Sequence, residues 1–270
     1  MGGYLEQTAS DGKLNVLLPT MPNHTPPVRL QHWILGPRVD SQPPWTGPPY
    51  TPTGKEHAWT DPMVDTCSGA ALIQHQGWGS LEALLFRDKG QGYSYLEHWF
   101  LQFGDPQPVW VDRMVEFQDP SQDLRMIGDT PALILSTVAG ITYFEALVPI
   151  RNTGLKHWFS AVDRQTGTPG TWVPGYQGQV IVQDAHGVAL IQSTVGNLEA
   201  LVHVGNDIQH WSRHTTGPVT RWVQGNGGNP IIKGVDAARR PALIQSNWGT
   251  FEALVSVQNG LQHWWCDTSK

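Results

Sequence analysis

The sequence predicts an all-β protein, a five-bladed β-propeller of four-stranded antiparallel blades. Three observations indicate this fold. The dipeptide His-Trp occurs five times, at spacings of 66, 59, 53 and 53 residues, beginning at His32, His98, His157, His210 and His263. A Glu-Ala-Leu motif, or a close variant, precedes each dipeptide, and an Ala-Leu-Ile motif precedes that in four repeats. A repeat of this length with several strand-like runs is typical of propellers and solenoids.

The individual strands are clearest in the fourth repeat, where the runs cover 188–193, 197–204, 208–213 and 220–223. Turn residues separate these runs, and none of them has helical periodicity. Four such strands make one propeller blade. We therefore expect a single domain over 1–270, with repeats of approximately 1–45, 46–112, 113–172, 173–222 and 223–270.

The sequence leaves two possibilities for how the propeller ring closes. A tryptophan follows His-Trp in four repeats, at Trp45, Trp110, Trp172 and Trp222, and the fifth repeat has no counterpart. Either the fifth blade borrows a strand, or the strand around each later tryptophan begins the following blade. The oligomeric state is equally open.

Composition and charge exclude several classes of partner. The formal net charge is −6, and the 17 Lys and Arg residues are scattered, so we expect no nucleic-acid partner. No apolar stretch approaches the roughly 20 residues of a membrane span, so no membrane partner is expected. With two cysteines and no signal-peptide pattern, the chain is expected to be cytoplasmic. Metal, phosphate-loop and dinucleotide motifs are absent, so we expect no metal and no cofactor.

One repeat resembles a known family. Residues 196–201 (Gly-Asn-Leu-Glu-Ala-Leu) and 208–213 (Ile-Gln-His-Trp-Ser-Arg) resemble the repeat of the bacterial PLL-type lectin propellers, as do residues 260–265. More loosely, the chain is similar to fungal propeller pericyclases, the hetero-Diels–Alderases of tropolone sesquiterpenoid pathways. The resemblance covers nearly the whole chain and implies a propeller fold. It implies less about the ligand, because propellers serve many unrelated functions.

The residues repeated in every blade are expected to be structural. Equivalent histidines on separate blades lie around a ring and do not converge at the roughly 2 Å distances of a zinc site. We expect each histidine to bond a nearby backbone group and each tryptophan to fill the space between blades. The repeated glutamates are expected to bond between strands, since acid–base chemistry on a sugar needs two carboxyl groups facing one substrate.

The departures from the repeat carry the candidate binding residues. Trp78, Trp248 and Tyr143 belong to the connection between the first two strands of three blades, so they share one rim if the blades are equivalent. Each of these aromatic side chains could bind a ligand at that rim or could equally pack on its own hairpin. The glutamines at the end of the innermost strand could bind a polar ligand group or ordered water: Gln74, Gln192 and Gln245.

Two long insertions, 36–68 and 104–130, also break the symmetry. Loops of this length are often lids or binding loops. Three side chains are candidate catalytic hydrogen-bond donors to a substrate carbonyl: Arg125 in the second insertion, Arg240 and His75.

Three functions remain. We favour a single aromatic-lined pocket at one end of the propeller that binds an apolar small molecule and catalyses a cofactor-free cycloaddition or cyclisation by positioning and polarisation. The alternative is a carbohydrate-binding lectin of the PLL-like type. A multivalent lectin should keep its arginine in most repeats, and the arginine two residues after His-Trp is present only as Arg213. A scaffold propeller that binds a protein through its rim is a third interpretation.

Overall fold

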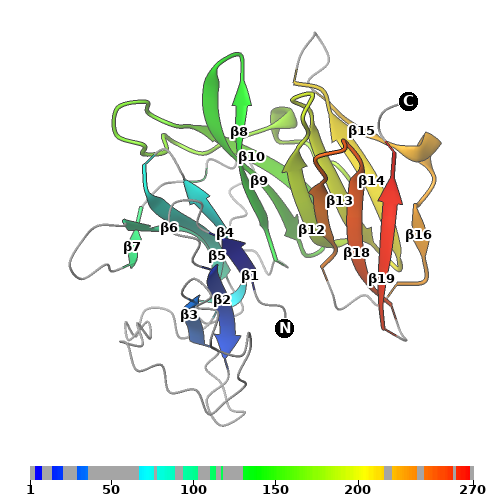
Figure 1. The fold of residues 1–270 in the computed structure, drawn as a ribbon, viewed down its shortest axis with the longest axis horizontal. Coiled ribbons are helices and arrows are strands. Elements are labelled where there is room, and N and C mark those ends of the chain that lie inside the picture. Colours follow the sequence, from blue (N-terminus) through cyan, green and yellow to red (C-terminus); the bar gives the residue numbers. More distant parts are fainter. Residues whose placement is uncertain are drawn as a thin grey trace.

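The structure, a computed structural model, is built from β-strands (Figure 1). It describes residues 4–7, 14–20, 29–35, 67–75, 78–88, 94–102, 110–113, 117, 130–215, 221–235, 240–257 and 260–267. The described helices are single 3-10 turns, η3 (Tyr176–Gly178) and η4 (Asn226–Gly228). No helix in these ranges is long and apolar enough to cross a membrane.

The strands form five antiparallel sheets that follow one another along the chain. Sheet 1 contains β1 (Tyr4–Gln7), β2 (Leu14–Thr20) and β3 (Arg29–Leu35). Sheet 2 contains β4 (Cys67–His75), β5 (Ser80–Asp88), β6 (Ser94–Gln102) and β7 (Trp110–Asp112). Sheet 3 contains β8 (Ala132–Val138), β9 (Ile141–Ile150), β10 (Gly154–Ala161) and β11 (Val173–Pro174).

The last two sheets continue the order. Sheet 4 contains β12 (Ala185–Gln192), β13 (Leu198–Val204), β14 (Asp207–Arg213) and β15 (Trp222–Gln224), and β16 (Ile232–Lys233) also pairs with β14. Sheet 5 contains β17 (Ala242–Gln245), β18 (Phe251–Val257) and β19 (Gly260–Cys266).

The all-β propeller with four-stranded antiparallel blades is confirmed, but five complete blades are not. Four consecutive strands pair in order in sheets 2, 3 and 4, whereas sheets 1 and 5 have three described strands each. The tryptophan strand that completes a blade is therefore missing from the first and last sheets in the described part of the chain. The prediction of five four-stranded blades is wrong on this point, because sheets 1 and 5 each contain three strands among the described residues.

The two faces of each sheet pack against different neighbours. We call the face toward the preceding sheet the front and the face toward the following sheet the back. Leu198 and Ala200 belong to the core shared with sheet 3, whereas Leu201 belongs to the core shared with sheet 5. Alternation along a strand produces this division. The sheets thus stack in sequence order, with sheets 1 and 5 at the two ends of the row (Figure 1).

The second insertion contributes Phe117 to the core between sheets 2 and 3. The Phe117 ring stacks on Trp172, with ring centroids 4.9 Å apart and an interplanar angle of 20°. Its edge meets Trp158 at 6.4 Å. The insertion is thus fixed to sheet 3 at this point. Arg125, predicted as catalytic, lies outside the described residues.

Candidate functional site

The side chains of the repeated glutamate and histidine contact each other within each of four sheets. The Nε2–Oε2 distances are 3.0 Å for His98–Glu82, 2.5 Å for His157–Glu145, 2.9 Å for His210–Glu199 and 3.1 Å for His263–Glu252. The expected structural role of both residues agrees with this arrangement. The expected backbone partner of the histidine is wrong, since the ring nitrogen faces the glutamate of the adjacent strand.

A glycine after the fourth strand makes room for this histidine. The Gly175 N–H donates to the His157 carbonyl at 2.8 Å, and the Gly225 N–H donates to the His210 carbonyl at 2.8 Å. A Cβ on Gly175 would lie 1.9 Å from Nδ1 of His157. Because φ at Gly175 is −73°, space and not backbone conformation requires the glycine.

Sheet 2 departs from this rule. Arg113 stands at the glycine position and makes the same backbone hydrogen bond, from its N–H to the His98 carbonyl at 2.8 Å. Its guanidinium turns to Glu82, with Nη2 2.7 Å from Oε1, and lies over the Phe100 ring at 3.8 Å. We call this region, between the back of sheet 2 and the front of sheet 3, the Arg113 junction.

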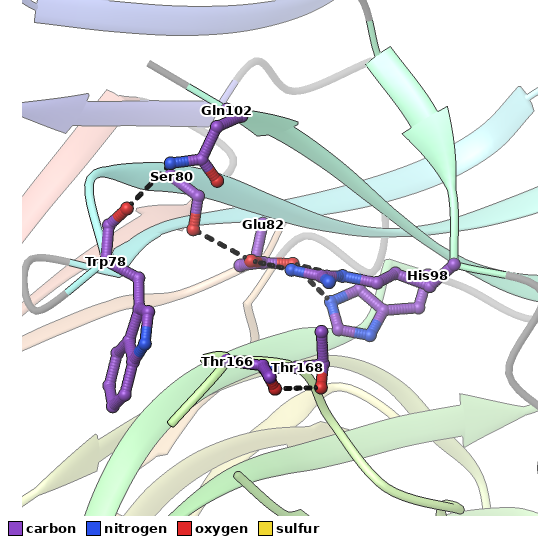
Figure 2. A network of polar contacts seen from close by, with 8 residues as sticks. Trp78, Ser80, Glu82, His98, Gln102, Thr166 and Thr168 are labelled. Atoms are coloured by element: carbon purple, nitrogen blue, oxygen red, sulfur yellow. Dashed lines mark hydrogen bonds and ion pairs between the residues drawn. The ribbon is translucent and has the colours of Figure 1, made fainter. Parts of the chain in front are cut away.

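The Glu82 carboxylate in the Arg113 junction has all its partners inside the protein (Figure 2). It is fully buried, accepts a hydrogen bond from Ser80 Oγ at 2.9 Å, and contacts His98 and Arg113. Burial would raise the pKa of Glu82, but the hydrogen bonds and charges of His98 and Arg113 outweigh burial and lower it. Burial also lowers the pKa of His98. The junction therefore holds an ionised carboxylate that needs no ligand.

Two predicted site residues meet at the rim of the same junction. The His75 and Trp78 rings lie 4.3 Å apart, and burial lowers the pKa of His75. Gln102 Nε2 donates to the Trp78 carbonyl at 2.8 Å (Figure 2). The other side of the indole is covered by Gly167 of sheet 3, where a Cβ would lie 2.3 Å from Cγ of Trp78. Trp78 thus packs between two sheets.

The hairpin that carries Gly167 is held in shape by its own side chains. Asp163 Oδ1 accepts hydrogen bonds from the backbone N–H groups of Gln165 and Thr166, at 2.8 and 2.9 Å. The Thr166 and Thr168 hydroxyls lie 2.6 Å apart, beside the buried cluster in Figure 2. This hairpin closes the rim of the Arg113 junction.

The next interface along the chain is arranged differently. Between the back of sheet 3 and the front of sheet 4, Arg213 Nη1 lies 3.6 Å from Glu145 Oε1. The Nε and Nη1 atoms of Arg213 are buried and have no hydrogen-bond partner among the described residues. Glu145 also contacts His157 and accepts a hydrogen bond from Ser136 Oγ at 3.1 Å. We call this region the Arg213 junction.

Two aromatic rings flank the carboxylate of the Arg213 junction. Phe159 is the cross-strand partner of Glu145, and Tyr143 meets the Phe159 ring at 5.9 Å with an interplanar angle of 75°. Tyr143, Phe159 and Arg213 are each partly exposed. A guanidinium, a carboxylate and an aromatic pair therefore share one partly open surface.

The predicted glutamines join sheets. The Gln192 side chain accepts from the Thr137 N–H and donates to the Thr137 carbonyl, both at 2.9 Å. Gln245 accepts from the Thr194 N–H at 2.7 Å. Both amides therefore bind the preceding sheet, while Gln74 is buried at the equivalent position of sheet 2. Leu135 of sheet 3 has no amide and cannot form this link to sheet 2.

The structure does not bring the predicted site residues into one pocket. Trp78 and His75 lie in the Arg113 junction, Tyr143 lies in the Arg213 junction, and Trp248 is 89% exposed on the hairpin before β18. Arg240 packs beside Gly187, its Cα 3.2 Å from where a Cβ would stand. The described residues hold no cluster of three metal-ligating side chains.

The prediction missed the two arginines that define the junctions. Arg113 could have been found from its position, three residues after Trp110, where the later repeats have Gly175 and Gly225. Arg213 is recognisable as the one arginine at its repeat position, but its partner Glu145 belongs to another repeat.

Known proteins share the fold of this chain at low sequence identity. The chain matches no known family profile and no curated protein. A Hadza microbial sialidase matches 93% of this chain and 52% of its own, with TM-score 0.57 and 10% identity. AofleA from Arthrobotrys oligospora, as an arginine-to-alanine mutant, matches 75% of this chain and 55% of its own, with TM-score 0.52 and 9% identity.

An exo-1,5-α-L-arabinanase from a bovine ruminal metagenomic library matches more evenly. It covers 98% of this chain and 93% of its own, with TM-score 0.52 and 14% identity. The chain spans about half the length of the sialidase and of AofleA. At these identities the similarities show the β-propeller fold alone.

Proposed function

We propose that this protein binds carbohydrate, at the Arg213 junction. The observation that carries the proposal is the Arg213 guanidinium, whose buried Nε and Nη1 atoms have no hydrogen-bond partner among the described residues, although the side chain as a whole is partly exposed. A buried donor without a partner costs roughly 1–3 kcal/mol. A ligand that supplies acceptors at this point recovers that free energy.

The chemistry of the surrounding groups fits a sugar. A guanidinium donates in a fixed planar geometry, and a carboxylate accepts, so together they bind hydroxyl groups that both donate and accept. The Phe159 and Tyr143 rings offer an apolar surface to the C–H face of a pyranose. The names of the sialidase and the arabinanase that share this fold refer to carbohydrate substrates, which is consistent with the proposal.

Binding is favoured over hydrolysis. Glycoside hydrolysis needs two carboxyl groups on either side of one bond. In the described junctions each glutamate faces a histidine of its own sheet. Among the described residues the Arg213 junction contains one carboxylate, that of Glu145, which contacts His157, Ser136 and Arg213.

The proposed site is not repeated in the neighbouring junctions. In the Arg113 junction the guanidinium is bound to Glu82 at 2.7 Å. Between sheets 4 and 5, Ser212 replaces the aromatic residue and Cys266 replaces the arginine, according to the strand registers. We therefore infer one site among these three junctions. The predicted apolar pocket and cycloaddition have no support from the described residues, because Trp78, Tyr143 and Trp248 lie apart.

The experiment is a glycan array followed by calorimetric titration of the best ligand. We expect Arg213→Ala to weaken binding about tenfold or more, because hydrogen bonds to a charged group contribute roughly 1.5–3 kcal/mol. Phe159→Ala should weaken it as well. The matched control is Arg151→Ala, which removes an equally charged, exposed side chain from the turn at the opposite end of β9.

Two results would overturn the proposal. One is the absence of any saturable glycan in the array. The other is a titration in which Arg213→Ala binds as tightly as the unchanged protein. Thermal unfolding of each variant verifies that a loss of binding is not a loss of fold.

A further inference from the structure

The back face of sheet 5 is an exposed apolar surface. Ile244, Leu254, Leu261 and Trp265 on this face are 59%, 44%, 66% and 70% exposed. Two of their counterparts in sheet 4 are covered: Leu201 is 4% exposed where sheet 5 has Leu254, and Ile208 is 1% exposed at the position of Leu261. Contiguous apolar surface of this kind marks an interaction site.

The inner sheets show what covers such a face. Leu201 and Ile208, on the back of sheet 4, share one core with Leu243, Ala253 and Val255, on the front of sheet 5. Sheets 2 and 3 meet in the same manner, back against front. The surface that fits the back of sheet 5 is therefore the front face of a sheet with this repeat.

Sheet 1 provides the matching register. Leu5 pairs with Val16, and Val16 pairs with Trp33, as Leu243 pairs with Ala253 and Ala253 pairs with Trp264. The positions that form a front face in sheet 5 are thus apolar in sheet 1 too. In this chain, however, sheets 1 and 5 lie at opposite ends of the row (Figure 1), and sheet 1 adjoins β4.

We propose that the back face of sheet 5 binds the front face of sheet 1 of a second copy of this chain. The contact continues the back-to-front packing that joins the sheets within the chain. The contact is head-to-tail, so each copy binds one neighbour through sheet 5 and another through sheet 1. Copies add until the assembly closes into a ring. Leu254, Leu261 and Trp265 become buried in this contact.

The experiment measures mass in solution by light scattering and sedimentation over a wide range of protein concentration. We expect assemblies of two or more copies, and we expect Leu261→Asp to shift the protein to monomers. Since Leu261 is already exposed, this substitution leaves the described core intact. The matched control is Val195→Asp, which places the same charge on an exposed hairpin outside this face and should leave the assembly unchanged.

A mixing experiment tests the direction of the contact. Val16→Asp should block the sheet 1 end alone, and Leu261→Asp the sheet 5 end alone. Each variant should be monomeric by itself, and their mixture should form pairs and nothing larger, because one intact end remains on each. A chain that stays monomeric at every concentration, or an assembly that survives Leu261→Asp, would overturn the proposal, whatever the outcome for carbohydrate binding.

Discussion

The Arg113 junction and the Arg213 junction contain the same kinds of group and use them differently. Each has a glutamate paired with a histidine, a phenylalanine across from that glutamate, and one arginine. In the Arg113 junction the arginine comes from the same sheet as the glutamate and approaches it to 2.7 Å. In the Arg213 junction the arginine comes from the next sheet and stops at 3.6 Å.

The difference shows how one repeat can serve stability at one position and binding at another. Arg113 satisfies Glu82 within the protein, and the hairpin over Trp78 closes the rim. Arg213 leaves Nε and Nη1 without a hydrogen-bond partner among the described residues, beside partly exposed rings. Polar groups that are satisfied internally contribute to the fold, whereas groups left unsatisfied have free energy to gain from a ligand.

The largest expected effect on stability comes from a substitution that disrupts the Arg113 junction. Arg113→Ala leaves the buried Glu82 carboxylate without its cation, so we expect a loss of about 3–5 kcal/mol in the free energy of unfolding. The loss for Arg213→Ala should be about 1 kcal/mol or less, because Nη1 lies 3.6 Å from Glu145, and Glu145 keeps its contacts with His157 and Ser136 without the arginine. Urea unfolding of both variants measures the two values. Equal losses would show that the two junctions do not differ in the way described.

An intermediate effect concerns pH. Burial lowers the pKa of His98 below its ordinary value of 6.5, so the folded protein keeps this histidine neutral while the unfolded chain takes up a proton. Stability should therefore fall as the pH drops below about 6.5, by at most about 1.4 kcal/mol per pH unit for each such histidine. His75 contributes in the same direction.

Glu82 extends this loss to lower pH. Its pKa is lowered from 4.5 in the fold, so the stability it contributes is present above pH 4.5 and is lost as the pH falls through its folded value. Urea unfolding at pH values from 7.5 to below 4.5 is the measurement, with His98→Gln as the comparison. A dependence on pH that is unchanged in His98→Gln would contradict the assignment.

The smallest expected effect is at the rim of the Arg213 junction. Gln192→Leu introduces the side chain that sheet 3 has at Leu135 and removes two hydrogen bonds to the Thr137 backbone. We expect a loss of about 1 kcal/mol, since these bonds are exposed and water replaces them in part. The measurement is the thermal midpoint, with Gln177→Leu, on the exposed 3-10 turn, as the control. A loss of several kcal/mol would mean that the rim carries more of the sheet packing than its contacts indicate.

The sequence by itself determined the strands, their antiparallel order and the structural role of the repeated residues. His-Trp and Glu-Ala-Leu fall on adjacent strands of one hairpin, and this local register places His157 beside Glu145, where the repeat alone predicted a backbone partner for the histidine. The tertiary structure decided which groups meet across sheets: Arg213 beside Glu145, Gln192 on the Thr137 backbone, Gly167 against Trp78. These contacts join separate repeats, and their distances depend on how two sheets pack. The alternation of residues along one strand carries no information on how two sheets pack. For this reason Trp78, Tyr143 and Trp248, which occupy similar positions in their repeats, do not form one site.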